Sequence, residues 1–240
     1  LFSDIAEGKA IVDARLDYGR LLVKAGRTVA PETLLIGYFA DARLGLEAYA
    51  DAVARHYRIK LPPQPTVYCT WYHAGASNEK DLPASAAFAK ERLAPFGFSV
   101  IQIDDGWQAG ATGNGPRKDF TTHRSDGPYA SGMRQTAENL RELGLTPGIW
   151  FMPFAGTWND PFFADKQYLF ATKDSKPFEV FWGGTCFDVT DPRTQEYIRS
   201  VASRIGRGWG YKYFKLDGLW TGMAADILYV NTGYKDDRLG

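Results

Sequence analysis

The sequence predicts an α/β protein whose main part is a (β/α)8 barrel, of which about the first four βα units are present. Apolar strand-like segments alternate with segments of helical periodicity over residues 63–240, which indicates a parallel sheet with right-handed crossovers. Two of these strands end in an Asp-Gly pair, at Asp105 and Asp217. A doubly wound dinucleotide fold is the alternative, but Gly110–Gly115 has the wrong order and context for its phosphate fingerprint.

Residues 1–62 are interpreted as the end of an N-terminal β-sandwich domain followed by a linking helix. Residues 10–17 and 34–39 are rich in β-forming residues and are separated by glycine and proline, as in an antiparallel β domain. A helix is predicted over about 43–57, because apolar residues recur there at helical spacing. The proline-rich stretch Leu61–Pro65 cannot continue a helix, so we place the domain boundary between residues 62 and 63.

The barrel region alternates regularly between the two kinds of element. Strands are predicted at 66–71, 98–104, 145–151 and 211–217, and helices at about 83–94, at 133–143 and from 192 onward. Asp191-Pro192 is a strong helix start, with an N-cap residue and a proline at the first helical position. The connections over about 108–130 and 152–190 are long, so we expect them to build a site above the strands.

Composition excludes several classes of partner. Lysine plus arginine and aspartate plus glutamate number 28 each, so nucleic acid and anionic membranes are not expected partners. No apolar run has the length of a membrane span, and the three histidines lack metal-ligand spacing, so no metal site is expected. Cys69 and Cys186 could be free thiols or a bridge. Because the chain runs from Leu1 to Gly240 without a start methionine or signal peptide, we expect a piece of a longer protein whose compartment and oligomeric state stay open.

The last strand carries the residues most suited to chemistry. Tyr213, Lys215 and Asp217 fall on one face of a strand predicted to be buried, opposite Phe214 and Leu216. A buried lysine and aspartate are costly unless they meet each other or a ligand. Asp217 is therefore a candidate for chemistry at the carboxyl end of the strand, and the alternative is a strand-end aspartate that caps a turn.

The second strand ends in adjacent carboxylates. Asp104 and Asp105 would face opposite ways in a regular strand, and both can reach one ligand only if the strand ends there, which Gly106 permits. The alternative is one ligand residue and one structural salt bridge. Aromatic residues near the strand ends are candidates for a pocket wall or for the core: Trp107, Trp158, Trp182 and Trp220. His73 is expected to act only as a hydrogen-bonding neighbour of the site.

Four motifs resemble glycoside hydrolase family 36, the α-galactosidases of clan D with their raffinose-synthase-like relatives. They occur in the family's order and spacing: Cys69–His73, Ile101–Trp107, Pro147–Phe151 and Phe214–Asp217. The resemblance implies retaining hydrolysis of terminal α-galactosides by double displacement, with a carbohydrate substrate and no cofactor. It assigns the nucleophile to Asp217 and contacts with sugar hydroxyls to Asp104, Asp105 and Lys215. It assigns the aromatic lining to Trp71 and Trp150. Because Trp107 lies next to the two carboxylates in the sequence, we expect it to belong to this lining as well.

Two features depart from the family pattern. The family's acid/base aspartate follows a later strand, so we expect it beyond Gly240 and expect these 240 residues alone to be inactive. Where the family offers the sugar an arginine, this chain has Trp182–Cys186. An α-N-acetylgalactosaminidase, a galactosyl transferase or a catalytically inactive sugar-binding homologue therefore remain alternatives.

Overall fold

The computed structural model describes residues 2–6, 9–14, 23, 25–30, 32–72, 78–109, 119–180, 182 and 184–222. His73 and Gly110–Gly115 lie outside these residues. The chain divides into two compact units, one formed by Leu1–Tyr18 with Ala25–Gln64 and the other by Gly19–Lys24 with Pro65–Gly240. Each unit is described by itself.

The first unit contains a hairpin and one helix. Strands β1 (Phe2–Ala6) and β2 (Lys9–Asp13) pair antiparallel. Helix α1 (Ala42–Tyr57) begins after Asp41, whose side chain accepts a hydrogen bond from the Arg43 amide at 2.8 Å. The prediction of strand structure at residues 34–39 is wrong, because these exposed residues form no strand in the described chain. Their β-forming side chains favour a strand only where a partner strand completes its hydrogen bonds. That this unit ends a β-sandwich stays a prediction.

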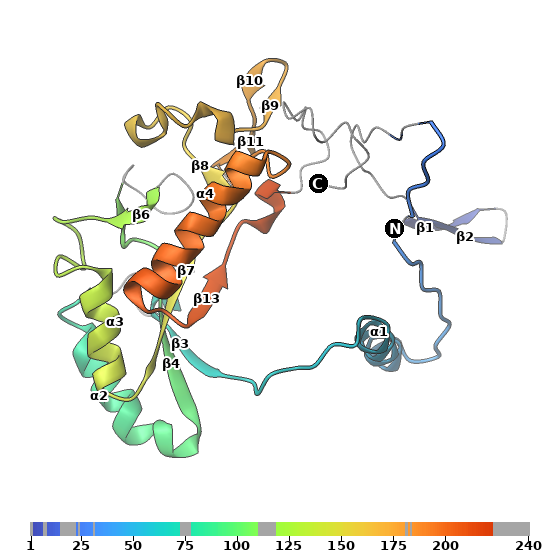
Figure 1. The fold of residues 1–240 in the computed structure, drawn as a ribbon. Helices are drawn as coiled ribbons and strands as arrows, with labels where there is room; N and C mark the ends of the chain where they lie inside the picture. The colour runs from blue at the N-terminus through green and yellow to red at the C-terminus, as the bar shows by residue number, and fades with distance from the viewer. Residues whose placement is uncertain are drawn as a thin grey trace. The chain divides into compact units, whose positions relative to one another are not determined.

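The second unit is organised around a curved parallel sheet (Figure 1). Its strands are β3 (Thr66–Cys69), β4 (Phe98–Ile103), β7 (Thr146–Phe151) and β13 (Tyr213–Leu216), in the order β13-β7-β4-β3. Each parallel strand therefore lies beside the one before it, and the order never reverses. A doubly wound sheet reverses its order at a switch point, whereas a barrel adds every strand on the same side. The described sheet fits part of a (β/α) barrel.

Three helices connect these strands. They are α2 (Leu82–Arg92), α3 (Met133–Glu142) and α4 (Pro192–Ser203), which continues into a π-helical turn, η5 (Arg204–Trp209). The predicted helix start is confirmed, since Asp191 caps α4 by accepting a hydrogen bond from the Arg193 amide at 2.8 Å. Helix α3 contacts both α2 and η5, so the helices form one continuous layer (Figure 1).

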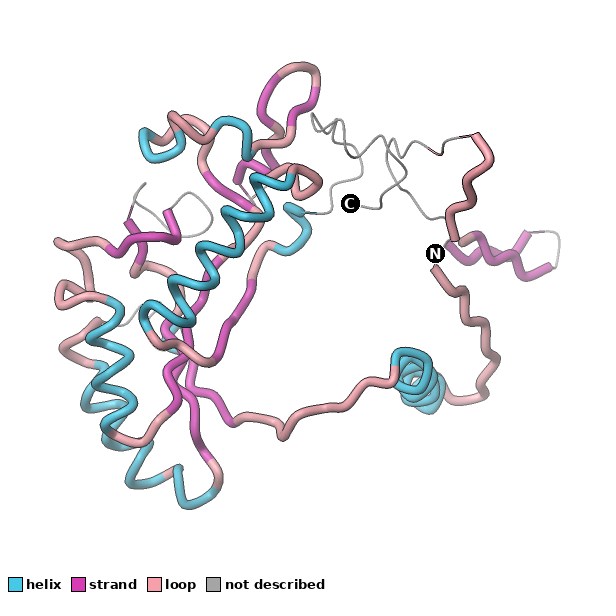
Figure 2. The backbone as a smooth tube through the Cα atoms, viewed as in Figure 1, coloured by secondary structure: helices cyan, strands magenta, loops and turns pink. Residues whose placement is uncertain are grey.

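The connection between β7 and α4 is a small structure of its own (Figure 2). Strands β11 (Glu179–Val180), β12 (Gly184–Cys186) and β8 (Ala155–Gly156) form a three-stranded antiparallel sheet, and β9 (Thr172–Lys173) pairs with β10 (Lys176–Pro177). Two short 3-10 helices, η3 (Pro161–Phe163) and η4 (Gln167–Leu169), complete it. Its buried side chains form a separate apolar cluster: Phe163, Leu169, Phe170 and Phe187.

Shorter elements follow the other strands. The 3-10 turns are η1 (Thr70–Tyr72) after β3, η2 (Ala94–Phe96) after α2 and η6 (Leu219–Gly222) after β13. After β4, β5 (Gln108–Ala109) pairs antiparallel with β6 (Asp119–His123). Both η1 and η6 lie at the carboxyl ends of sheet strands, where an α/β barrel keeps its functional residues.

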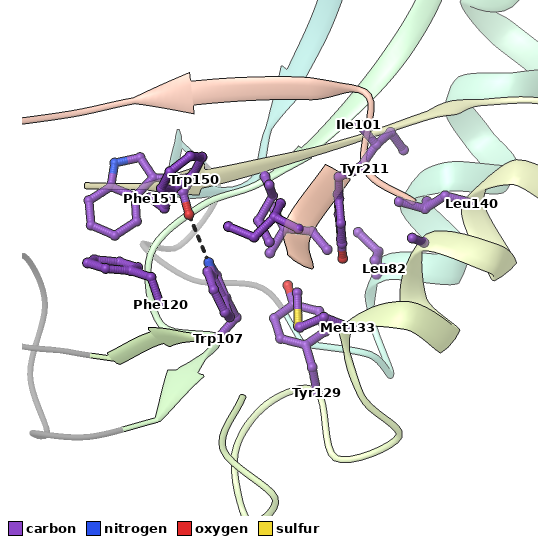
Figure 3. Close-up of a cluster of buried hydrophobic side chains, with 14 of the residues drawn as sticks. Leu82, Ile101, Trp107, Phe120, Tyr129, Met133, Leu140, Trp150, Phe151 and Tyr211 are labelled. Atoms are coloured by element: carbon purple, nitrogen blue, oxygen red, sulfur yellow. Dashed lines mark hydrogen bonds between the residues drawn. The ribbon is translucent and has the colours of Figure 1, made fainter. Parts of the chain in front are cut away.

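The main core lies between the sheet and the helices (Figure 3). Ile101 and Ile149 of the strands are fully buried in the same cluster as Leu140 of α3. The last strand differs from expectation, because Phe214 and Leu216 are exposed. Strand β13 is an outer strand of the described sheet, and Phe214 is only partly covered there by the Phe151 ring, whose centroid lies 5.8 Å from its own. None of the described helices is both long and apolar enough to span a membrane.

Candidate active site

Side chains from four neighbouring strands meet at the carboxyl edge of the sheet. They surround a pocket of about 260 Å³ whose lining residues are Trp71, Tyr72, Asp104, Asp105, Trp150, Trp182, Lys215 and Asp217. Because the carboxyl ends of parallel strands share one edge of the sheet, residues separated by more than a hundred positions converge here. The structure thus brings six of the seven sequence-predicted residues together, all except Trp107.

Asp104 is the most heavily bonded carboxylate of the pocket. Its Oδ2 accepts hydrogen bonds from Lys215 Nζ at 2.7 Å, Gln102 Nε2 at 2.9 Å and Cys69 Sγ at 3.2 Å. The backbone amide of Asp105 donates to its Oδ1 at 2.9 Å. Four donors on one buried carboxylate favour its charged form, so Asp104 is a fixed negative charge at the base of the pocket.

The electrostatics of Asp104 and Lys215 follow from this contact. Burial raises the pKa of Asp104, but the hydrogen bonds from Lys215 and Gln102 outweigh it and hold the pKa below its ordinary value. Burial lowers the pKa of Lys215, but the bond to Asp104 reverses this effect and leaves the pKa raised. Lys215 therefore pairs with Asp104 across strands and not with Asp217 on its own strand face, although its charge stays within the pocket.

Asp105 shares the pocket because the strand ends before it. Strand β4 stops at Ile103, and Gly106 has a φ of +115°, which turns the chain. Asp105 is buried, and its Oδ1 accepts a hydrogen bond from Gln108 Nε2 at 2.7 Å. Both adjacent carboxylates consequently line one pocket, as the sequence predicts for a strand that ends there.

Asp217 is oriented by two donors, one on each oxygen. Trp150 Nε1 donates to Oδ2 at 3.0 Å, and the Gly218 amide donates to Oδ1 at 2.8 Å. Gly218 has a φ of +59°, and a Cβ there would lie 2.0 Å from Met152 Cε. The left-handed backbone after Asp217 therefore favours glycine, and a larger residue would also require the end of the Met152 side chain to shift.

The aromatic lining comes from three separate segments. Trp71 and Tyr72 belong to η1, Trp150 to β7 and Trp182 to the turn between β11 and β12. Lys215 Nζ lies 5.8 Å from the centre of the Tyr72 ring, a distance at which a cation and an aromatic face attract each other. Aromatic faces together with charged groups can bind a ligand that has both an apolar face and hydroxyl groups.

The expectation that Trp107 lines the pocket is not met by the structure. Its side chain is completely buried in the main core, and its Nε1 donates to the Trp150 carbonyl at 2.9 Å (Figure 3). The chain turns at Gly106, so the indole points under β7 instead of towards the carboxylates. Trp107 supports the backbone of Trp150, whose own indole reaches Asp217.

Several contributors escaped the sequence reasoning. Tyr72 lines the pocket next to Trp71, while Gln102, Thr70 and Cys69 hold Asp104 from behind. Gln102 lies two residues before Asp104, and its register partner is Gly148. A Cβ on Gly148 would lie 3.1 Å from Gln102 Cα and Cβ. The sequence signal for this role of Gln102 was a polar glutamine in one buried strand together with a glycine in the neighbouring buried strand.

The thiols and acidic groups of the described residues form no metal site. Cys69 and Cys186 are both free thiols, and burial raises the pKa of Cys186 to about 12. Within the described residues, no group of three or more histidine, cysteine and acidic side chains could hold a metal ion.

Polar and aromatic side chains gathered at the carboxyl ends of the strands are typical of the active sites of α/β-barrel enzymes. No family model matches the chain. Among solved structures, a variant of the family 36 α-galactosidase from Geobacillus stearothermophilus in complex with 1-deoxygalactonojirimycin aligns over 64% of this chain and 21% of its own, with a TM-score of 0.54 and 18% identity.

Two further structures extend this similarity. The α-galactosidase from Thermus thermophilus in complex with stachyose aligns over 69% of this chain and 36% of its own, with a TM-score of 0.52 and 28% identity. The α-galactosidase from Lactobacillus brevis aligns over 64% and 20%, with a TM-score of 0.52 and 17% identity. The chain is thus a relative of the family 36 α-galactosidases over about two thirds of its length, and it spans between a fifth and about a third of the length of these structures.

Proposed function

We propose that this chain carries the nucleophile and the sugar pocket of a retaining glycoside hydrolase that releases terminal α-linked galactose. The observation that carries the proposal is the position of Asp217 in one small pocket with Asp104, Asp105 and Lys215. The similar α-galactosidase from Thermus thermophilus binds stachyose and p-nitrophenyl α-D-galactopyranoside, which supports a galactoside as the ligand.

In this proposal Asp217 attacks the anomeric carbon. A retaining enzyme forms a covalent glycosyl intermediate on a carboxylate, which must be ionised and correctly oriented when the substrate arrives. Trp150 Nε1 and the Gly218 amide hold one oxygen each. They fix the plane of the carboxylate before the sugar binds, so little reorganisation remains for the reaction.

Asp104, Asp105 and Lys215 would bind the sugar hydroxyls. Galactose differs from glucose by an axial hydroxyl at carbon four, and a buried acceptor that the wrong epimer leaves unpaired is an effective means of selection. Both carboxylates are at most 7% exposed, and each accepts bonds from neighbours that keep it in place. Trp71, Trp150 and Trp182 would cover the apolar face of the ring.

The general acid must be a different group. Retention requires a second carboxyl group about 5–5.5 Å from the nucleophile, and it must be protonated to assist the leaving group. Asp104 is unsuited, because its bond to Lys215 keeps it charged and holds its pKa low. Because the family resemblance places the acid/base aspartate after a later strand, we infer that the acid comes from a part of the protein outside the described residues.

The proposal is tested with the full-length protein that carries this chain. An aryl α-galactoside should be hydrolysed at least about a hundredfold more efficiently than the aryl α-glucoside, measured as kcat/KM. Asp217→Ala should abolish turnover, and added azide should restore part of it by replacing the carboxylate as nucleophile. Near-normal turnover in Asp217→Ala would contradict the assignment. Galactose binding without any turnover in the unmodified protein would point instead to an inactive sugar-binding homologue.

A further inference from the structure

Two tryptophans meet beside the pocket although they come from different elements. Trp182 lies in the turn between β11 and β12, and Trp220 belongs to η6, which follows Asp217 directly. Their ring centroids are 5.9 Å apart and their planes are inclined by 37°. The two indoles therefore form a nearly continuous aromatic surface, and the described contacts between β12 and η6 hold it together.

This surface is open to solvent. Trp182 is 43% exposed and Trp220 is 49% exposed, whereas Trp107 of the core is completely buried. Exposed indoles forgo the hydrophobic stabilisation of about 25 cal/mol per Å² that burial would give. Paired exposed aromatic side chains next to a polar pocket are therefore better explained by a ligand than by folding.

The backbone of Trp182 supports a role of this kind. Its φ is +60°, in the left-handed region that is unfavourable for a residue with a side chain. Glycine or asparagine would adopt this left-handed conformation with less backbone strain. A bulky residue at such a position points to a use for its side chain, and here the indole reaches the pocket that contains Asp217.

The two indoles differ in their relation to the pocket. Trp182 lines it, but Trp220 is not among its lining residues. The surface consequently begins inside the pocket with Trp182 and continues outside the pocket lining with Trp220. A pyranose ring has one apolar face of C–H groups, which packs well on an indole.

We propose that Trp182 and Trp220 form a stacking surface for the sugar unit to which the terminal galactose is attached. This inference rests on the proposed function of the pocket and extends it, because it gives the protein a preference for oligosaccharides over galactosides with small substituents. Trp182 contacts both sugar units, whereas Trp220 contacts the second unit alone. Trp220 is thus a specificity-determining residue outside the pocket.

The test compares the affinities of two ligands by isothermal titration calorimetry. The full-length protein is used with Asp217→Asn, so that nothing is hydrolysed, and the ligands are galactose and the disaccharide galactosyl-α-1,6-glucose. Trp220→Ala should weaken disaccharide binding about tenfold, the factor that corresponds to losing one good stacking contact, and should leave galactose binding within about twofold. Trp220→Phe should retain most of the disaccharide affinity, because it keeps a flat aromatic face.

Trp158 supplies the matched control. It is 39% exposed and belongs to the same connection between β7 and α4, but it does not line the pocket. Trp158→Ala should leave both affinities unchanged. If Trp220→Ala weakens the binding of both ligands equally, or of neither, the proposed stacking surface is wrong while the proposed function stands. If the parent protein binds neither sugar, the proposed function fails and this inference fails with it.

Discussion

Gly218 shows how closely the backbone next to Asp217 is constrained. Its φ of +59° disfavours any side chain, and a Cβ would lie 2.0 Å from the Cε of Met152, which is itself buried. Left-handed strain and overpacking together should make Gly218→Ala about 2–4 kcal/mol less stable to unfolding by urea. Turnover should fall as well, because the same amide orients Asp217.

Gly97 is the control for this prediction. It also has a positive φ, of +92°, but no atom lies within 4 Å of the site of its Cβ. Gly97→Ala should therefore show only the backbone strain of about 1–2 kcal/mol and keep normal turnover. Equal losses of stability in the two variants would show that Met152 moves away easily and that the close contact has no consequence.

The pair formed by Lys215 and Asp104 makes stability depend on pH. Because the pKa of Asp104 is lowered in the folded state, its contribution is present above its unfolded pKa of about 3.9 and is lost as the pH falls through the folded value. Lys215→Met should cost about 1.5–3 kcal/mol at pH 7, the range for a hydrogen bond to a charged group. The loss should shrink as the pH falls below about 3.9, where the contribution of the charged Asp104 is lost in the unaltered protein.

Urea unfolding at pH 7 and at about pH 3 measures both values. Lys212→Met is the matched control, since Lys212 is exposed and lies on the same segment. It should change stability by less than about 0.5 kcal/mol at either pH. A loss in Lys215→Met that is the same at both pH values would mean that Asp104 does not depend on Lys215 for its charge.

Residue types and strand register predicted most of the pocket, but not the directions of all its side chains. Asp104, Asp105, Lys215 and Asp217 could be found because each lies at or just beyond the end of a predicted strand. Trp107 could not be placed, because the turn at Gly106 decides where its indole points. The donors Gln102 and Trp150 reach their carboxylates through packing of side chains, which local sequence does not encode.

At the scale of elements, helix α4 depends on its first turn. Asp191 Oδ1 accepts the Arg193 amide at 2.8 Å, and the same carboxylate pairs with the Arg193 guanidinium at 2.6 Å. Asp191→Ala should cost about 1 kcal/mol of stability through the lost cap. Galactose affinity should not change, because Asp191 does not line the pocket.

Arg193→Met removes the ion pair with Asp191 but keeps the N-cap hydrogen bond, because the donor of that bond is the Arg193 backbone amide. The arginine side chain is largely exposed, so removing it should cost less than removing the cap. Thermal unfolding of the two variants gives the comparison. Equal losses would assign the stabilisation to the ion pair and not to the N-cap.

Helices were easier to predict than strands in this chain. Asp191-Pro192, Pro83 and Gly144 mark helix ends by local chemistry, and helices α2, α3 and α4 lie where these signals predict them. Strands depend on distant partners. Residues 34–39 have a strand-like composition without forming a strand, and β13 was predicted to be buried although its outer face is exposed.

For the whole molecule, the alternation of strands and helices predicted the parallel sheet and its order. The sequence favoured a barrel over a doubly wound sheet because the phosphate fingerprint is missing. The strand order β13-β7-β4-β3 supports the barrel directly. The internal structure of residues 152–190 was expected only as a long loop. Its short strands lack any periodicity that sequence could show, since most contain two residues.

The exposed side of β13 leads to a prediction for the 240 residues expressed alone. In the described part of the chain, β13 is an outer strand, and Phe214, Leu216 and Leu219 are all exposed there. An uncovered sheet edge with apolar side chains favours association with other chains. Light scattering after size exclusion should therefore give a mass well above the 26.7 kDa of one chain.

Leu216→Lys should reduce the association, because a charge on an edge strand opposes edge-to-edge pairing. Phe88→Lys, on exposed apolar surface of α2, should not reduce it. A monomer of the unaltered chain at micromolar concentration would overturn this view of β13.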